Sequence, residues 1–283
     1  MLATRPAIAS SLGRVAAADG TELATRHWPA PEGRRPWATL LLVHGLAEHS
    51  GRYDHVGARF AEAGIDTYAY DQRGFGASGG RRAWVDRWSR YHDDLGERVV
   101  AARTTAGGGP VVVYGHSLGG LVALGYALTD PKLDALVLSA PALDANVPAW
   151  KRALARVLGV AVPRLEVKNA LNTSVLSRDP QVGVLYLADP LNHHRTTARL
   201  GLEFLREQAR VRAAVGGLRV PTLIIHGEAD RLVPTRASAP LAEVPAVTRR
   251  TYPGLRHEMH NEPEGPAVID DVIGWLRERF AGR

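Results

Sequence analysis

The chain has 283 residues, of which 45% are hydrophobic and 23% are charged, as is typical of a soluble globular domain. It contains no cysteine, which excludes disulfide bonds and thiolate chemistry. The net charge of +6 would suit nucleic-acid binding, but the arginines are scattered along the whole chain instead of gathering on one element. Nucleic acid is therefore not an expected partner.

The N-terminal residues have no continuous apolar core followed by a cleavage site, so no secretory signal is predicted. No stretch approaches the roughly 18 consecutive apolar residues of a membrane-spanning helix. We therefore expect a cytoplasmic protein.

Apolar runs separated by glycine- and proline-marked turns predict the elements in chain order. Residues 11–29 contain the turn Ala-Asp-Gly between two alternating stretches, which indicates a β-hairpin. Buried strands are then predicted at 38–45, 65–71, 110–115, 133–141, 221–230 and 247–254. Helices are predicted at 52–64, 88–105, 121–129 and 266–280. Since solid apolar strands alternate with helices, we expect an α/β fold with a mostly parallel central sheet flanked by helices.

Residues 142–210 interrupt this alternation. They contain helical stretches, around 150–158 and from 197 onward, but no apolar strand comparable with those of the predicted sheet. We expect residues 1–141 and 211–283 to form the two parts of one core, and residues 142–210 to be an inserted helical unit.

The stretch Gly115-His116-Ser117-Leu118-Gly119 has the pattern G-x-S-x-G, directly after a predicted strand and before a predicted helix. Such an elbow holds a serine in a strained turn at the carboxyl edge of the sheet, where helix N–H groups can stabilise an oxyanion. The placement predicts Ser117 as a nucleophile.

A nucleophilic serine needs a general base and an acid that orients it. Asp230 and His257 each follow one of the last two predicted strands, in the chain order Ser, Asp, His that this type of hydrolase uses. Asp144 is an alternative acid and His260 an alternative base. The tight turn around Asp230 and the strand-end position of His257 favour the first pair.

The second half of an oxyanion hole is expected in the loop after the first buried strand, at His44-Gly45-Leu46. We predict the backbone N–H groups of Leu46 and Leu118 as the two donors. No histidine or acidic cluster has the spacing of a metal site, and this chemistry needs no cofactor, so none is expected.

The residues described so far resemble the α/β-hydrolase superfamily over nearly the whole chain, and within it the monoacylglycerol lipases of bacterial type. The motifs that carry the resemblance are HGLAEHSGRY (44–53), AYDQRGFGASGG (69–80), GHSLGG (115–120), SVLSRDP (174–180), YLADPL (186–191) and HGEADRLVP (226–234). The first, fourth and fifth motifs are more specific than the serine elbow, which most hydrolases share.

The resemblance implies a serine esterase that cleaves monoacylglycerols into glycerol and fatty acid. It implies that residues 142–210 form a lipophilic cap that can make transient contact with a membrane surface. Glu48 and Arg52 match the family loop beside the substrate, and His116 either reaches the alcohol part of the substrate or supports the elbow. Gln181 stands close to where the family often has a glutamate near the glycerol hydroxyls, so a charged contact is missing there.

Other functions remain open from the sequence alone. The same scaffold supports a general carboxylesterase, a lysophospholipase, a serine aminopeptidase or a binding protein without turnover. A peptidase would need an acidic group in the cap to hold a substrate amine. The sequence specifies no oligomeric state.

Overall fold

The computed structural model describes residues 8–33, 35–129, 132–144, 147–169 and 171–281. Its main sheet has eight strands in the order β1-β2-β4-β3-β5-β6-β9-β10. The strands are β1 (Ser11–Ala16), β2 (Glu22–Trp28), β3 (Ala38–Val43), β4 (Ile65–Tyr70), β5 (Val111–His116), β6 (Ala135–Ser139), β9 (Thr222–Gly227) and β10 (Val247–Tyr252). Strands β4, β3, β5, β6, β9 and β10 run parallel, and the β1–β2 hairpin joins β4 in an antiparallel manner. The predicted α/β fold is confirmed.

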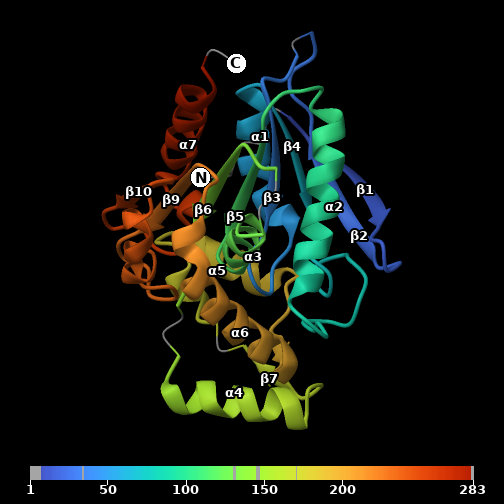
Figure 1. Ribbon diagram of the computed structural model, residues 1–283, viewed down its shortest axis with the longest axis vertical. Helices are drawn as coiled ribbons and strands as arrows, with labels where there is room; N and C mark the ends of the chain where they lie inside the picture. The colour runs from blue at the N-terminus through green and yellow to red at the C-terminus, as the bar shows by residue number, and fades with distance from the viewer. Residues whose placement is uncertain (1–7, 34, 130–131, 145–146, 170, 282–283) are drawn as a thin grey trace.

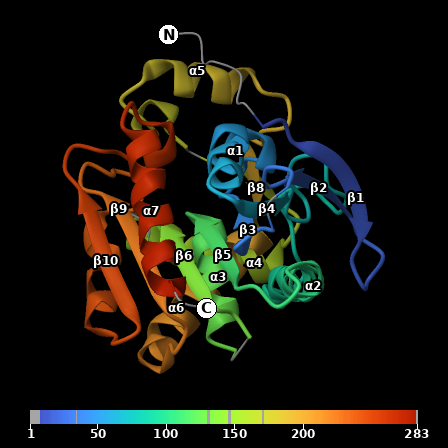
Figure 2. The same ribbon diagram turned by 90° about the horizontal axis from the view of Figure 1, so that it is seen from above.

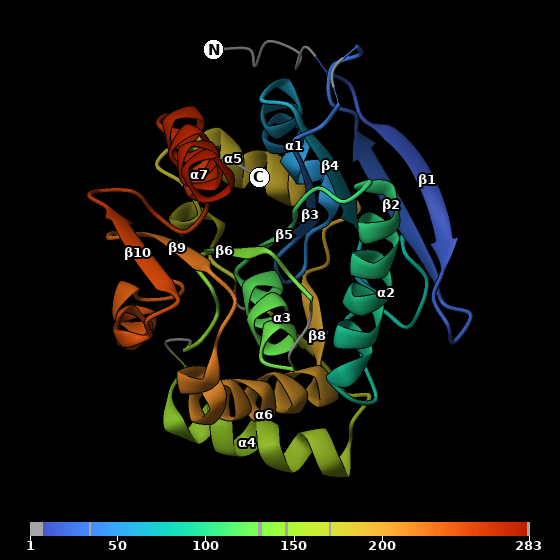
Figure 3. The same ribbon diagram turned by 45° about the horizontal axis from the view of Figure 1, so that its top comes forward.

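Helices cover both faces of this sheet, as Figure 3 shows. One face carries α1 (Asp54–Glu62) and α7 (Gly265–Phe280), and the other carries α2 (Ser89–Thr105), α3 (Leu118–Ala127) and α6 (Ala198–Ala214). The central strands β3, β5, β6 and β9 are buried along their whole length because side chains on both faces pack against helices. Short 3₁₀ turns lie at Ser50–Tyr53, Thr173–Val175, Val215–Gly217, Thr235–Ala237, Ala239–Glu243 and Met259–Asn261.

The described residues of the segment 142–210 add no strand to the main sheet. They form α4 (Ala149–Ala161), α5 (Pro180–Ala188) and a two-stranded ribbon of β7 (Glu166–Lys168) and β8 (Arg195–Thr197), and then enter α6. Helix α4 lies across α6 on the side away from the sheet (Figure 1). The predicted boundary at residue 210 falls inside α6.

Close packing between α4 and α6 depends on a glycine. A Cβ atom on Gly159 would lie 2.4 Å from the Cβ of Leu202 and 2.8 Å from the carbonyl oxygen of Ala198. A side chain there would push the two helices apart, so Gly159 fixes the line along which α4 contacts α6.

Helix α5 was not predicted from the sequence. Asp179 caps it by accepting a 2.9 Å hydrogen bond from the N–H of Gln181, and Pro180 occupies the first turn. These start signals are visible in the sequence, but the helix is short and apolar on several sides, so its periodicity gives no helical signal. Within the described residues, no helix is both long enough and apolar enough to cross a membrane.

Candidate active site

Ser117 joins β5 to α3 with a backbone φ of 51° and ψ of −115°. Two glycines make room for this strained turn. A Cβ on Gly115 would lie 2.6 Å from the carbonyl oxygen of Gly119, and a Cβ on Gly119 would lie 2.2 Å from that of Val43. Backbone atoms surround both positions and cannot yield, which explains the glycines of the G-x-S-x-G pattern.

His257 and Asp230 lie together at the carboxyl edge of the sheet, after β10 and β9 respectively. The His257 Nδ1 atom lies 2.7 Å from Oδ2 of Asp230. The other carboxylate oxygen of Asp230 accepts hydrogen bonds from the N–H groups of Leu232 (2.8 Å) and Val233 (2.9 Å). Both side chains are buried. Backbone N–H groups hold one oxygen of the carboxylate and His257 contacts the other, so the Nε2 atom of the imidazole takes no part in the contact with Asp230.

Each of these two groups changes the pKa of the other. Burial by itself would raise the pKa of Asp230, but the charge of His257 and hydrogen bonds from His226, His257 and Val233 outweigh it and hold this pKa well below its usual range. Burial by itself would lower the pKa of His257, but the carboxylate of Asp230 outweighs it and raises this pKa above its ordinary value.

His226 is a third member of this cluster that sequence reasoning missed. Its Nε2 atom lies 2.9 Å from the carbonyl oxygen of Val233 and 3.3 Å from Oδ2 of Asp230, and its Nδ1 atom lies 2.8 Å from Oγ of Ser238. It therefore supports the turn that carries Asp230. The sequence shows this histidine as the first residue of the motif HGEAD.

A cavity of about 250 Å³ brings most of the predicted residues together. Ser117, His257, Leu46, Leu118, His116 and Glu48 all line it. Its remaining wall is largely apolar and includes Val147, Leu171, Leu176, Phe204, Leu232 and Val233.

Three predicted residues are not part of this lining. Asp230 lies behind His257, and Arg52 contacts Glu48 beneath the cavity. Gln181 is exposed in the first turn of α5, and the structure gives its side chain no place in the cavity wall.

The loop that carries Leu46 is held on both sides. The carboxylate of Glu48 accepts a 2.6 Å hydrogen bond from the N–H of Gly45. Ala47 adopts a positive φ of 65°, and its carbonyl oxygen accepts hydrogen bonds from the hydroxyl of Tyr186 (2.9 Å) and the N–H of His193 (3.0 Å). Opposite this loop, Leu118 is the first residue of α3, where an N–H has no partner inside the helix.

A buried ionic network lies below the cavity. Arg52 pairs with Glu48, makes two 2.7 Å hydrogen bonds to Glu258, and lies 4.8 Å from the ring centre of Tyr186. Burial would raise the pKa of Glu48, but the charge of Arg52 outweighs it and lowers this pKa to about 2. Glu48 therefore stays ionised. Arg52 pairs with both acids, so neither faces the cavity without a partner.

The other candidates occupy different places. Asp144 accepts a 2.8 Å hydrogen bond from Arg152. His260 is buried, its ring stacks 4.7 Å from that of Tyr53, and neither of its ring nitrogens has a partner among the described residues. His116 places Nδ1 3.2 Å from Oγ of Ser139, and burial together with the charge of His257 lowers its pKa to about 4. The geometry thus favours Asp230 and His257 over their alternatives.

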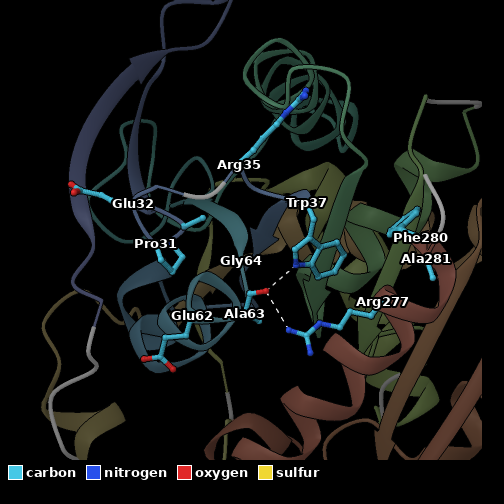
Figure 4. Close-up of a pocket in the computed structure, with 11 residues that line it drawn as sticks. Pro31, Glu32, Arg35, Trp37, Glu62, Ala63, Gly64, Arg277, Phe280 and Ala281 are labelled. Atoms are coloured by element: carbon cyan, nitrogen blue, oxygen red, sulfur yellow. Dashed lines mark hydrogen bonds between the residues drawn. The ribbon is translucent and has the colours of Figure 1, made fainter.

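A second, larger cavity of about 510 Å³, shown in Figure 4, shares no lining residue with the first. Trp37, Arg277, Phe280 and Glu62 are among the residues that line it. Trp37 Nε1 and Arg277 both donate to the carbonyl oxygen of Ala63, at 2.8 and 3.4 Å. Its lining holds no serine or histidine. Among the described residues, no group of three or more histidine, aspartate or glutamate side chains is arranged to hold a metal ion.

The sheet order, the serine elbow and the Asp230–His257 pair define an α/β-hydrolase. The family described as serine aminopeptidase, S33, matches residues 34–264. A monoacylglycerol lipase of Mycolicibacterium smegmatis is 39% identical over 85% of this chain and 88% of its own. A monoglyceride lipase of Homo sapiens is 32% identical over 93% of this chain and 89% of its own. The chain belongs to the monoacylglycerol lipase family.

A solved structure agrees with this assignment. The crystal structure of the Paleococcus ferrophilus monoacylglycerol lipase superposes with a TM-score of 0.81 at 30% identity, and the match covers 95% of this chain and 99% of that one. The predicted resemblance is therefore confirmed at the level of fold and family.

Proposed function

We propose that the protein hydrolyses monoacylglycerols to glycerol and free fatty acid, with Ser117 as nucleophile, His257 as general base and Asp230 as the acid that orients it. The observation that carries the proposal is the 2.7 Å contact between His257 and Asp230 at the cavity that Ser117 also lines. The names of the relatives support the choice of a lipid ester.

The chemistry follows from this arrangement in two halves. The Ser117 Oγ attacks the ester carbonyl while His257 takes its proton, and the N–H groups of Leu46 and Leu118 stabilise the oxyanion. His257 then gives the proton to the departing glycerol oxygen, which leaves an acyl-serine. Water, activated by His257, attacks this ester and releases the fatty acid and free Ser117.

Residues 142–210 act as the cap of this site in our proposal. They contribute Val147, Leu171, Leu176 and Tyr186 to the cavity wall. Three of these four side chains are aliphatic, and burying an acyl chain against them is favourable by about 0.8 kcal/mol for each methylene group. An acyl group thus has more to gain here than a charged or peptide substrate.

Aminopeptidase activity, which the description of the matched family suggests, has less support in the cavity. The acidic side chains of its wall are Glu48 and Glu258. Both already bind Arg52, so neither is a free carboxylate for a substrate amine.

The test is fatty-acid release from monoacylglycerols of increasing chain length. Diacylglycerols, triacylglycerols, a lysophospholipid, p-nitrophenyl esters and an aminoacyl anilide serve as competing substrate classes. Ser117→Ala is the blank and Ser89→Ala, at an exposed serine of α2, is the matched control. We expect the highest kcat/KM on a monoacylglycerol, with all activity lost in Ser117→Ala and kept in Ser89→Ala.

Each other outcome changes the proposal in a defined way. Faster turnover of simple esters than of any monoacylglycerol would make the protein a general carboxylesterase. Faster cleavage of the anilide would make it a peptidase. A fluorophosphonate probe that labels Ser117→Ala as strongly as the unaltered protein would exclude Ser117 as the nucleophile.

We further propose that α4 makes transient contact with an anionic lipid surface. Its exposed apolar side chains are Trp150 (64% exposed), Leu154 (46%), Val157 (63%) and Val160 (65%). Its charged residues are Lys151, Arg152 and Arg156, and its sequence contains no acid. Apolar and basic side chains on one short helix are typical of interfacial binding.

Co-sedimentation with vesicles tests this contact. We expect binding to phosphatidylglycerol vesicles, weaker binding to phosphatidylcholine vesicles, and a loss of both in Trp150→Ser/Val157→Ser. Leu12→Ser is the matched control, because Leu12 is 72% exposed on β1, at the edge of the sheet. Unchanged binding in the α4 variant would remove α4 from the contact.

A further inference from the structure

One buried carboxylate joins the loop of His257 to the inserted unit. Glu262 is only 4% exposed, and its Oε1 atom accepts a 2.8 Å hydrogen bond from the N–H of Arg256, the residue before His257. Its Oε2 atom accepts from the N–H and Nε of Arg178, both at 3.0 Å, and from Oγ of Ser177 at 3.3 Å. Two distant segments are therefore held by the same side chain.

Further bonds between these segments flank His257 on both sides. The N–H of Glu258 donates to the carbonyl oxygen of Leu176 at 2.8 Å. Arg256 Nη1 donates to the carbonyl oxygens of Ser174 (2.7 Å) and Ser177 (2.8 Å). Leu176 itself lines the cavity. The main chain around His257 thus depends on the same segment, residues 174–178, that forms part of the cavity wall.

We propose that Glu262 is a positioning residue for His257: by tying residues 256–262 to residues 174–178, it sets the place of the imidazole relative to Ser117. The inference rests on the proposed function. It also means that residues 174–178 are a fixed part of the inserted unit and serve every substrate of the site, including esters too small to reach the rest of the wall.

The charge of Glu262 is what makes this tie specific. An ionised carboxylate only accepts hydrogen bonds, and every partner of Glu262 here is a donor. A glutamine at this position would have an N–H₂ group in place of one carboxylate oxygen. That group would face hydrogen-bond donors, so the hydrogen bonds on that side would be lost. A misplacement of His257 by about 1 Å is enough to cost roughly a hundredfold in rate.

The experiment compares Glu262→Gln with Glu264→Gln. Glu264 is the matched control because it also pairs with Arg178, but through the outer Nη2 atom. The bonds from the Arg256 N–H and the Ser177 hydroxyl go to Glu262 instead. Both proteins are assayed on p-nitrophenyl acetate and on a long-chain monoacylglycerol. The rate of inactivation by a fluorophosphonate gives a third measure of how well His257 activates Ser117.

We expect Glu262→Gln to lower kcat at least about tenfold on both substrates, by the same factor and with little change in KM. Inactivation by the fluorophosphonate should slow by a similar factor. The acid limb of the pH–rate profile should move to lower pH, since a loosened His257 receives less support from Asp230. Glu264→Gln should stay within about twofold of the unaltered protein.

Three results would overturn the inference. They are a loss confined to the long-chain substrate, an equal loss in Glu264→Gln, and a loss of less than about twofold in Glu262→Gln. If Glu262→Gln does not fold, Arg178→Met is the deciding variant. It removes one side-chain bond to Glu262 and leaves the bond from the backbone N–H of Arg178 in place. It should lower kcat on both substrates by the same factor, but by less than Glu262→Gln. If the unaltered protein cleaves p-nitrophenyl acetate, any of these results overturns the inference about Glu262 and leaves the proposed function standing. If the unaltered protein is inactive, both the inference and the proposed function fail.

Discussion

Arg52 donates two parallel hydrogen bonds of 2.7 Å to the carboxylate of Glu258, the residue that directly follows His257. The two residues are separated by 206 positions in the chain, and their side chains are only 9% and 3% exposed. Arg52 also pairs with Glu48, which accepts from the N–H of Gly45 in the loop of the predicted oxyanion hole. This one guanidinium therefore links the oxyanion loop to the histidine loop.

The link predicts strong coupling in a double-mutant cycle of Arg52→Met and Glu258→Gln. Removing one partner of a buried ion pair leaves an uncompensated charge, so Arg52→Met should lower the free energy of unfolding by about 3–5 kcal/mol. The double variant should lose less free energy of unfolding than the sum of the two single variants, by more than about 1 kcal/mol. Urea unfolding measures all four proteins.

The exposed pair Arg14 and Glu22 on the β1–β2 hairpin is the control for this cycle. Its removal should change the free energy of unfolding by less than about 1 kcal/mol, because solvent screens the interaction. Additive losses at Arg52 and Glu258 would show that the link does not act as a unit.

Asp230→Asn should lower kcat by roughly 10³–10⁴-fold on every ester that the protein cleaves, because an amide can hold His257 in the wrong tautomer and no longer stabilises its charged form. Asp144→Asn is the matched control at the alternative acid, which pairs with Arg152. It should leave kcat within about twofold. A large loss in Asp144→Asn with a small loss in Asp230→Asn would reverse the assignment of the acid.

The pH dependence should be governed by His257. Catalysis needs its neutral form, and the carboxylate of Asp230 raises its pKa above the ordinary value despite burial. Activity should therefore fall toward acid with an apparent pKa above about 6.5. His116 should add no second step near neutral pH, since its pKa lies at about 4.

The measurement is kcat/KM on p-nitrophenyl butyrate across this pH range. In Asp230→Asn the residual activity should show its acid limb at lower pH, because the supporting charge is gone. If the acid limb is unchanged in Asp230→Asn, His257 is not the group whose protonation sets that limb.

The sequence predicted those parts of the site that depend on local signals. Ser117, Asp230 and His257 each follow a strand with a short loop, and parallel strands end at one edge of the sheet. Their convergence therefore followed from the predicted sheet. The elbow also explains why α3 begins at Leu118, three residues before the predicted start: Ser117 directly follows the last residue of β5 and occupies the N-cap position of the helix.

The parts that were missed depend on contacts between distant segments. No local pattern pairs Arg52 with Glu258, because these residues come from the two separate parts of the core. Nor does one pair Glu262 with Arg178, because they meet only after the inserted unit has folded onto the core. Gln181 shows the converse. Its role came from a matching motif position, but the start of α5 leaves it exposed, and its contact with substrate stays a prediction.

The glycines provide a last test, because two of them should respond to alanine in opposite directions. A Cβ on Gly119 would lie 2.2 Å from the carbonyl oxygen of Val43 and 2.4 Å from that of His44, whereas a Cβ on Gly274 in α7 would meet nothing within 4 Å. Gly119→Ala should lower the free energy of unfolding by roughly 3 kcal/mol, because the backbone has to move. Gly274→Ala should raise it by about 0.5–1 kcal/mol, because the helix gains propensity without a clash.

Activity separates the two glycines further. Val43 and His44 lead into the oxyanion loop, so relief of the clash in Gly119→Ala should displace the N–H of Leu46 and lower kcat about 10²–10³-fold, as the loss of one oxyanion donor does. Gly274→Ala should keep full activity. A Gly119→Ala protein with unchanged stability and kcat would show that the elbow tolerates a side chain and that close packing does not explain the second glycine of the G-x-S-x-G pattern.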